Sequence, residues 1–269
     1  MTAGTTRPTP VETEMTPSRD QTPTPLAPHP VLTGHYPMQD HRVPYIRRLF
    51  DVTAPSYDTI NAWMSLRTGE GYRLDALRRA GIGPGQRALD IATGTGVLAA
   101  HAARLVGPEG GVYAIDPSLG MLREAGKRGG FQRIAGIAES LPLPDRSLDF
   151  ISMGYALRHV ADLRQTFDEF HRVLKPGGRL LILEIVPPPS RLGYGLTKFY
   201  LKHLVPRLAA LVTRNRDARR LMQYYWDTVE QCVAPAVIED TLAAAGFHAV
   251  QRTVRQALMN EYSARRPTG

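Results

Sequence analysis

Residues 88–96 read Ala-Leu-Asp-Ile-Ala-Thr-Gly-Thr-Gly, and residues 112–116 read Val-Tyr-Ala-Ile-Asp. Together they predict a strand, a glycine turn that opens a helix, and a second strand that ends on a carboxylate. Gly94 and Gly96 lack a Cβ, so the backbone can turn sharply there and a ligand can approach it closely. Asp116 lies 20 residues after Gly96, where an acid can bind both hydroxyls of a ribose. A nucleoside cofactor is therefore the first hypothesis.

The glycine motif alone leaves the cofactor open. Gly94-x-Gly96-x-x-Ala99 also matches the dinucleotide pattern, and an ordinary strand-to-helix turn would use the same glycines. Two observations favour S-adenosylmethionine over NAD. Asp90, at the end of the first strand, can orient an ammonium group, which S-adenosylmethionine carries and NAD lacks. About 85 residues precede the motif, whereas a dinucleotide fold usually begins near the start of its chain or domain.

Composition predicts one globular catalytic domain with a leader. Of the 269 residues, 43% are hydrophobic and 22% charged, as in ordinary globular proteins. Cys232 is the single cysteine, which excludes an intramolecular disulfide and a cysteine metal site and suits a reducing cytoplasm. No apolar stretch approaches the roughly 20 residues that span a bilayer. Residues 1–40, rich in proline and threonine, are expected to be disordered, and residues 41–269 to form the catalytic domain.

Helices and strands are expected to alternate along the rest of the chain. A helical cap is predicted from Tyr45 onward, before the first strand. After the second strand, the pattern predicts a helix at 118–127 with Ser118 as its N-cap, a strand at 148–155, a helix at 163–174 stopped by Lys-Pro-Gly-Gly at 175–178, and a strand at 179–186. This alternation predicts an α/β fold with a mostly parallel sheet, which binds ligands beyond the carboxyl ends of its strands.

Further short segments accompany the glycine motif in a fixed order. They are 49–51 (LFD), 56–58 (SYD), 61–65 (NAWMS), 138–145 (AESLPLPD), 155–160 (YALRHV), 172–178 (RVLKPGG), 199–200 (FY) and 205–207 (VPR). With these segments, over roughly residues 45–265, the chain resembles the class I S-adenosylmethionine-dependent methyltransferases. Within that class it is similar to the ubiquinone/menaquinone biosynthesis C-methyltransferase family.

The resemblance implies a Rossmann-like, seven-stranded sheet whose last strand is antiparallel, with S-adenosylmethionine as cofactor. The expected cofactor-binding residues come from the helical cap, the glycine motif and the loops after later strands: Tyr57, Asn61, Asp90, Ala92, Thr93, Gly94, Thr95, Gly96, Asp116, Pro117, Met121, Ile137, Ala138, Glu139 and Gly154. Two positions depart from the family. Ala92 replaces the first glycine of the turn. Ile137 replaces the usual Asn or Asp, so adenine recognition must depend more on backbone groups and apolar packing.

Methyl transfer mainly requires that the acceptor be aligned with the methyl group and water be excluded. Carbon methylation of a hydroquinone also requires that a phenol proton leave. The resemblance makes Arg158 the candidate that orients a water or stabilises the phenolate, since a guanidinium is a poor direct base. His159, where the family has Asn, could take the proton itself. A structural ion pair for Arg158 and a surface position for His159 are the alternatives.

Several aromatic residues are expected around the acceptor, and Tyr57 is a third catalytic candidate beside Arg158 and His159. The expected acceptor-binding residues are Tyr155, Arg158, His159, Phe199, Tyr200, Tyr225 and Trp226. The segment 224–230 replaces the family's own C-terminal substrate segment, so the acceptor is less certain than the reaction. No metal is expected to take part.

The segment 191–220 carries eight Lys and Arg residues against Asp217, which gives +7 of the net charge of +8. Apolar residues alternate with these cations, so the segment is basic and amphipathic. No nucleic-acid motif accompanies it. A lid at about 190–230 that admits a lipophilic acceptor from an anionic membrane surface is one interpretation, and a solvated face over a core face is the other.

These observations predict S-adenosylmethionine-dependent methyl transfer, with C-methylation of a quinol or a related aromatic lipophilic acceptor as the first interpretation. O- or N-methylation of another aromatic metabolite or lipid amine is one alternative. A catalytically inactive cofactor-binding subunit of a biosynthetic complex is another. The protein is expected in the cytoplasm, peripherally on the inner face of a membrane, with a homodimer as a candidate assembly and no nucleic-acid partner.

Overall fold

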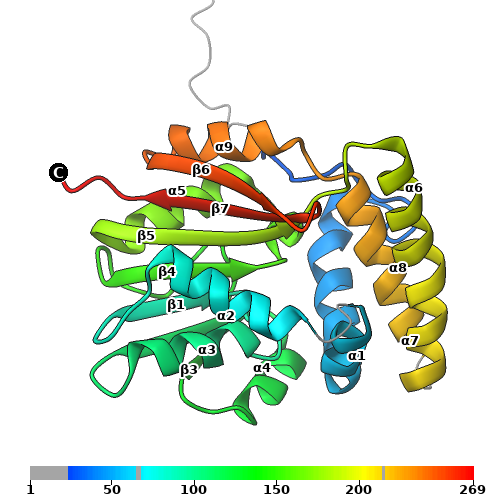
Figure 1. The fold of residues 1–269 in the computed structure, drawn as a ribbon, viewed down its shortest axis with the longest axis horizontal. Helices are drawn as coiled ribbons and strands as arrows, with labels where there is room; N and C mark the ends of the chain where they lie inside the picture. The colour runs from blue at the N-terminus through cyan, green and yellow to red at the C-terminus, as the bar shows by residue number, and fades with distance from the viewer. Residues whose placement is uncertain (1–23, 65–67, 214–215) are drawn as a thin grey trace, which may run out of the picture.

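The computed structural model describes residues 24–64, 68–213 and 216–269, which form a seven-stranded sheet with helices on both faces (Figure 1). The strand order is β3-β2-β1-β4-β5-β7-β6. Strands β1 to β5 pair in parallel, and β7 is antiparallel to both of its neighbours. The predicted Rossmann-like sheet with an antiparallel last strand is thus confirmed.

The strands are β1 Arg87–Ile91, β2 Gly111–Asp116, β3 Gln132–Ala135, β4 Leu148–Gly154, β5 Leu174–Ile185, β6 His248–Arg255 and β7 Met259–Arg265. The α-helices are α1 Arg42–Met64, α2 Gly69–Ala80, α3 Val97–Val106, α4 Leu119–Gly126, α5 Leu163–Val173, α6 Arg191–Lys198, α7 Val205–Thr213, α8 Arg216–Glu230 and α9 Pro235–Ala244. Two short 3₁₀ turns, η1 Gln39–His41 and η2 Leu157–His159, and one π-helical turn, η3 Phe199–Leu204, complete the described elements.

The central strands are apolar on both faces because helices cover both faces. Along β1, Ala88 packs into the cluster formed with α2 and α3, whereas Leu89 and Ile91 pack into the cluster formed with α5 and α9. Apolar residues directed to both faces of a strand are typical of a parallel sheet in an α/β protein. The predicted helices at 118–127 and 163–174 are also present, and the Ser118 hydroxyl accepts a hydrogen bond from Met121 N as its N-cap.

Beyond the carboxyl ends of the parallel strands lies a group of helices that we call the cap: α1, α6, η3, α7 and α8 (Figure 1). Apolar side chains from α1, η3, α7 and α8 form a third buried cluster there. Two carboxylates fasten α1 to the sheet. Asp51 accepts a hydrogen bond from Ser118 Oγ at 2.6 Å, and Asp58 binds the Thr95 hydroxyl and, at 2.7 Å, Arg128. The cap helix α1 is therefore held over the glycine loop.

The prediction of a disordered leader up to residue 40 is wrong for residues 24–40, which pack against the domain; residues 1–23 lie outside the described residues. His29, Leu32 and Tyr36 are all less than 5% exposed. His29 accepts a hydrogen bond from Arg42 at 3.1 Å, since burial first and the Arg42 charge second lower its pKa to about 4 and keep it neutral. Apolar burial and these hydrogen bonds offset the entropy of ordering the segment. We call residues 24–40 the N-terminal strap.

The turn expected at 175–178 is part of strand β5, which begins at Leu174 rather than at Arg179. The backbone of this stretch is hydrogen-bonded on both sides. Leu174 pairs with Leu148 of β4, and Gly177 and Gly178 exchange hydrogen bonds with Arg266 beyond β7. A register shift between Leu148 and Phe150 absorbs the irregular geometry. Pairing with two neighbours thus decides the local structure against the turn preference of the Pro-Gly-Gly sequence.

Candidate functional site

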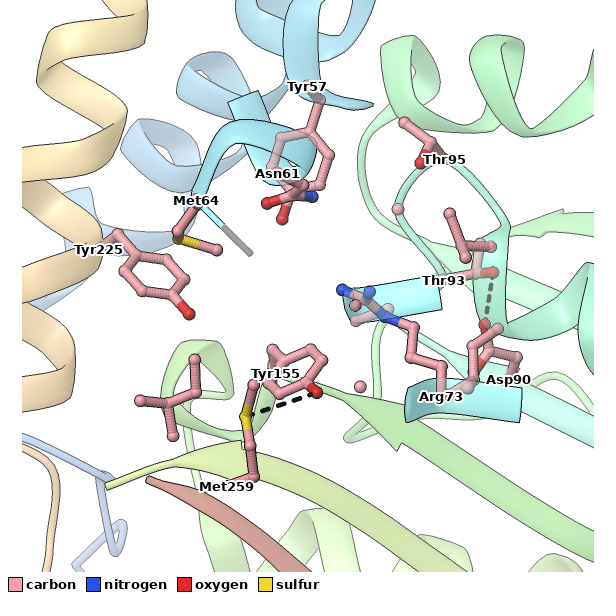
Figure 2. Close-up of a pocket in the computed structure, with 17 residues that line it drawn as sticks. Tyr57, Asn61, Met64, Arg73, Asp90, Thr93, Thr95, Tyr155, Tyr225 and Met259 are labelled. Carbon is pink, nitrogen blue, oxygen red and sulfur yellow. Dashed lines mark hydrogen bonds between the residues drawn. The ribbon is translucent and has the colours of Figure 1, made fainter. Parts of the chain in front are cut away.

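Two neighbouring cavities open at the carboxyl ends of β1 and β4, under the cap. The first, of about 70 Å³, is lined by Tyr57, Asn61, Met64, Gly69, Arg73, Asp90, Ala92, Thr93, Gly94, Thr95, Val97, Leu98, Gly154, Tyr155, Ile185, Tyr225 and Met259 (Figure 2). The second, of about 240 Å³, is lined by Val43, Ile46, Arg47, Ala92, Ile115, Pro117, Gly136, Ile137, Ala138, Glu139, Met153, Ala156, His159, Val160, Ala161 and Gln165. Ala92 of the glycine loop lines both, so the cavities are adjacent.

The two glycines of the motif serve different purposes. Both have a positive φ, +56° at Gly94 and +80° at Gly96, which side chains disfavour. A Cβ on Gly96 would lie 2.7 Å from Phe131 Cζ and 3.1 Å from Ala125 Cβ, so Gly96 is required for packing. A Cβ on Gly94 would meet only the Tyr57 ring, at 4.0 Å. Gly94 therefore faces the first cavity, where its backbone is open to a ligand.

Two buried carboxylates lie beside the glycine loop. Asp90 accepts hydrogen bonds from Thr93 Oγ1 at 2.6 Å and Ser152 Oγ at 2.7 Å, and it lines the first cavity. Asp116 accepts from Gly94 N and Ser118 N, both at 2.8 Å, and lines neither cavity. Burial raises the pKa of each carboxyl to about 6, against the hydrogen bonds that lower it. Each can therefore supply a counter-charge near neutral pH that is lost in acid.

The predicted cofactor residues fall into three groups. Those that line the first cavity are Tyr57, Asn61, Asp90, Ala92, Thr93, Gly94, Thr95 and Gly154. Those that line the second are Ala92, Pro117, Ile137, Ala138 and Glu139, although the Glu139 carboxylate is occupied by Ala161 N. Gly96, Asp116 and Met121 line neither cavity; Gly96 and Met121 instead pack beneath the loop.

Sequence reasoning missed Arg73, which is the basic residue lining the first cavity. It projects from α2 into the space between Asn61 and Asp90, and its guanidinium lies 4.9 Å from the centre of the Tyr155 ring (Figure 2). Nothing in the helical pattern of α2 distinguishes Arg73 from its neighbours Arg78 and Arg79. Its position on the first turns of the helix, close to the carboxyl end of the sheet, is what brings it to the cavity.

Arg158 lies behind the first cavity instead of lining it. It is 2% exposed and donates to Glu184 Oε2 at 2.8 Å, to the Tyr155 carbonyl at 2.7 Å and to Thr228 Oγ1 at 3.1 Å. Burial is the largest single effect and lowers the pKa of Arg158, but the Glu184 carboxylate, together with smaller effects of Tyr225 and other neighbours, raises that pKa overall. The structure thus supports the alternative of a structural ion pair for Arg158. In this arrangement Arg158 does not contact an acceptor in the first cavity. Its guanidinium covers the Tyr225 ring at 4.3 Å.

His159 lines the second cavity, apart from the first cavity's aromatic residues. Its ring stacks on Tyr224, and Nδ1 shares a hydrogen bond with the Tyr224 hydroxyl at 3.2 Å. Burial first, and the positive charge of Arg158 second, lower the pKa of His159 well below its usual 6.5. The half-buried His159 ring is therefore a weak base, because its surroundings disfavour the protonated form, and this argues against its use as the proton acceptor.

The expected acceptor residues are only partly brought together. Tyr155 and Tyr225 line the first cavity. Trp226 does not: it is fully buried in the cap, where its Nε1 donates to Glu230 at 3.0 Å. Phe199 is 61% exposed, and Tyr200 approaches the backbone of Trp63 and Met64 without lining either cavity. Phe199, Tyr200 and Trp226 thus lie outside both cavities, and their contact with the acceptor stays a prediction.

Glu184→Gln tests the buried ion pair. The variant keeps the size of the side chain but leaves the buried Arg158 charge without a counter-ion, so unfolding free energy should fall by about 3–5 kcal/mol. Urea denaturation measures the change. Asp75→Asn, which breaks the Arg78–Asp75 pair with both side chains 59% exposed, is the matched control and should cost less than about 0.5 kcal/mol. Equal small shifts in the two variants would contradict this account.

Comparison with known proteins identifies the family. The model of the ubiE/COQ5 methyltransferase family matches residues 38–257. The chain is 35% identical over 226 residues to the demethylmenaquinone methyltransferase of Symbiobacterium thermophilum, with 78% of this chain and 88% of that protein covered. It is 34% identical over 223 residues to the ubiquinone/menaquinone biosynthesis C-methyltransferase UbiE of Syntrophotalea carbinolica, with 81% and 92% covered.

A solved S-adenosylmethionine-dependent methyltransferase from Thermotoga maritima shares the fold, with a TM-score of 0.58 and 20% identity over 81% of this chain and 98% of that one. The family match and the identity to the curated relatives go further than the fold. S-adenosylmethionine is thus the cofactor of this protein, and the chain belongs to the ubiE/COQ5 methyltransferase family.

Proposed function

We propose that this protein transfers the methyl group of S-adenosylmethionine to a ring carbon of a quinol or a related lipophilic aromatic acceptor. The observation that carries the proposal is the meeting of two unlike cavities at the glycine loop, one mostly apolar and one combining charged and aromatic side chains. S-Adenosylmethionine supplies an already activated methyl group when bound. The chain therefore has to bind the cofactor and the acceptor, orient the acceptor toward the methyl group, and exclude water.

The second cavity suits an adenine ring. Ile115, Pro117, Ile137 and Val160 give it apolar walls, and Ile137 is itself 43% exposed toward solvent. Its volume of about 240 Å³ is the larger of the two, as a flat bicyclic base requires. Asp116 ends β2 between the glycine loop and this cavity, so we assign the ribose hydroxyls to its carboxylate, whose two oxygens keep free lone pairs beside the two backbone donors.

The first cavity suits the amino-acid end of the cofactor. Asp90 offers a carboxylate to an ammonium group, and Arg73 offers a guanidinium to a carboxylate; both line the first cavity together with Gly94 and Thr93. The pairing of opposite charges fixes the direction in which the ligand lies. Tyr57, whose hydroxyl bonds Asn61, closes the cavity from α1 (Figure 2).

The remaining wall of the first cavity suits an apolar aromatic acceptor. Met64, Tyr155, Tyr225 and Met259 surround it on the side away from Asp90 (Figure 2). Tyr155 holds a left-handed backbone conformation with φ of +60°, which side chains adopt rarely and which Arg158 supports through the Tyr155 carbonyl. Backbone strain that the surroundings maintain is a common feature of active sites.

Product analysis tests the proposed reaction. The protein should convert a demethylated, short-chain quinol into a product heavier by one methyl group when S-adenosylmethionine labelled in its methyl group is supplied. Nuclear magnetic resonance of the product should place the label on a ring carbon. A label on oxygen or nitrogen would overturn carbon methylation, and an absence of S-adenosylhomocysteine formation would favour an inactive cofactor-binding subunit.

Cofactor affinity should depend on pH. Asp90 and Asp116 become protonated as the pH falls through about 6, which removes the carboxylates assigned to the ammonium and the ribose. The dissociation constant measured by calorimetry should therefore rise between pH 7.5 and pH 5 by about tenfold for each carboxyl. Asp116→Asn should bind more weakly at pH 7.5 and show a shallower dependence on pH.

The protonation of Asp90 and Asp116 at low pH should not weaken cofactor binding by unfolding the protein. Their pKa values are raised above 3.8 in the folded state, so their contribution to stability is present at low pH and is lost as the pH rises through about 6. Circular dichroism at each pH checks that the protein remains folded. A dissociation constant that is independent of pH in a folded protein would contradict the placement of both carboxylates.

We also propose that α6, η3 and α7 dock on an anionic membrane surface that holds the acceptor. Leu192, Leu196 and Leu211 are 76%, 62% and 75% exposed on this face, with Arg191 and Arg207 exposed beside them. None of the described helices is long and apolar enough to cross a membrane. Apolar side chains interleaved with cations are what an interfacial helix presents to lipid headgroups.

Replacing Leu192, Leu196 and Leu211 together by serine should reduce sedimentation with vesicles of phosphatidylglycerol by at least about tenfold. Turnover on a vesicle-embedded quinol should fall, while turnover on a short-chain quinol in solution should stay at the parental rate. Leu119→Ser with Val254→Ser, both 50% exposed and away from this face, is the control. If the parent protein does not sediment with such vesicles, the proposal of membrane docking is wrong.

A further inference from the structure

Three hydroxyl groups of tyrosines line the first cavity, and two of them are already engaged. The Tyr57 hydroxyl bonds Asn61, and the Tyr155 hydroxyl donates to Met259 Sδ at 3.8 Å. The Tyr225 hydroxyl is buried and has no hydrogen-bond partner among residues 24–64, 68–213 and 216–269. Tyr225 is only 6% exposed, and Figure 2 shows its hydroxyl directed into the cavity. A buried hydroxyl without a partner is unfavourable, so this one is poised for a ligand.

We propose that the Tyr225 hydroxyl donates a hydrogen bond to the phenolic oxygen of the acceptor, and that Arg158 is a positioning residue that acts through Tyr225. This inference rests on the proposed carbon methylation of a quinol. The phenol proton leaves to water, and the deprotonated oxygen gives electron density to the ring as the ring carbon forms its bond to the methyl group and the sulfur–methyl bond breaks to release S-adenosylhomocysteine. The hydrogen on the methylated ring carbon then leaves to water, which restores the aromatic ring. A donor on that oxygen fixes which ring carbon faces the methyl group and holds the phenolate form in place.

The surroundings of Tyr225 keep it a donor. Burial raises the pKa of Tyr225, so its hydroxyl keeps its proton at neutral pH, and the Arg158 charge acts in the opposite direction. The Arg158 guanidinium lies 4.3 Å from the centre of the Tyr225 ring and is itself fixed by Glu184 and Thr228. A cation on the ring face makes the hydroxyl a stronger donor and prevents the ring from turning away.

This arrangement also explains why Arg158 matters without touching the cavity. Arg158 lines neither cavity and its charge is neutralised by Glu184. The residue that carries its effect to the acceptor is therefore one on α8, in the segment that departs from the family's usual C-terminal sequence.

Tyr225→Phe removes the hydroxyl and keeps the ring on Arg158. With a short-chain quinol, kcat should fall by about 100-fold, the loss expected when the reactive ring carbon is no longer aligned with the methyl group, while the calorimetric dissociation constant of S-adenosylmethionine changes by less than about threefold. Tyr262→Phe is the matched control. Tyr262 is also fully buried with an unpartnered hydroxyl, but it lines neither cavity, so its kcat should remain parental.

Double-mutant kinetics test the role of Arg158. Arg158→Lys should lower kcat in the parent and have little further effect in the Tyr225→Phe background, because both changes interrupt one pathway. Should Arg158→Lys fail to fold, Thr228→Val, which removes the bond to Arg158 Nε, replaces it in the same cycle. A structural role for Arg158 would instead give additive losses, and additive losses overturn its action through Tyr225.

The outcomes separate this inference from the proposed function. A parent protein that methylates the quinol on carbon, together with a Tyr225→Phe variant of parental kcat, would overturn the inference alone. A weakened dissociation constant for S-adenosylmethionine in Tyr225→Phe would also overturn it, since the hydroxyl would then bind the cofactor. A parent that methylates no quinol would refute the proposed function itself.

Discussion

The buried ion pair between Arg158 and Glu184 connects the sheet to the cap. Glu184 lies near the end of β5, Arg158 lies in η2 after β4, and Thr228 on α8 receives the remaining contact of the guanidinium. Charges this deeply buried, 2% and 3% exposed, are tolerated only when paired. The Arg158–Glu184 pair therefore helps to fix the position of α8 relative to the strand ends. The position of the cavity wall formed by Tyr225 on α8 follows from it.

A second set of contacts holds the opposite wall. The α1 helix is fastened by Asp51 to the start of α4 and by Asp58 to the glycine loop. Asp51 directly follows Phe50 on α1, and Asp58 directly follows Tyr57. The cleft is thus enclosed by two elements, α1 and α8, that are fixed to different strands. The two walls also pack directly against each other in the buried cluster of the cap, so a change in one is transmitted to the other.

The parts of this structure that sequence could predict are those with a local physical rule. The glycine loop, the strand ends and the Ser118 cap follow from backbone conformation and hydrogen bonding over a few residues. Residues 224–226 show where such rules fail, because consecutive side chains on a helix point about 100° apart. Tyr225 therefore reaches the cavity, whereas Trp226 turns into the cap core.

The features that the sequence did not predict depend on residues distant in the chain or on the exact rotation of a helix. The π-helical turn at Phe199–Leu204 adds a residue to the turn and rotates Phe199 and Tyr200 away from the positions that a regular helix predicts. Arg73 acquires its role only from the fold, and the N-terminal strap is ordered by the loops near Asp162 and Val233.

The strap also sets an order of assembly. Leu26 exchanges hydrogen bonds with Asp162 and Leu163, and Pro28 receives one from Val233, so the first described residues of the chain must wait for segments synthesised much later. On the ribosome, the N-terminal strap can form these contacts only after residues 162–163 and 233 have emerged, which leaves the strap exposed to chaperones and proteases for most of the synthesis of the chain.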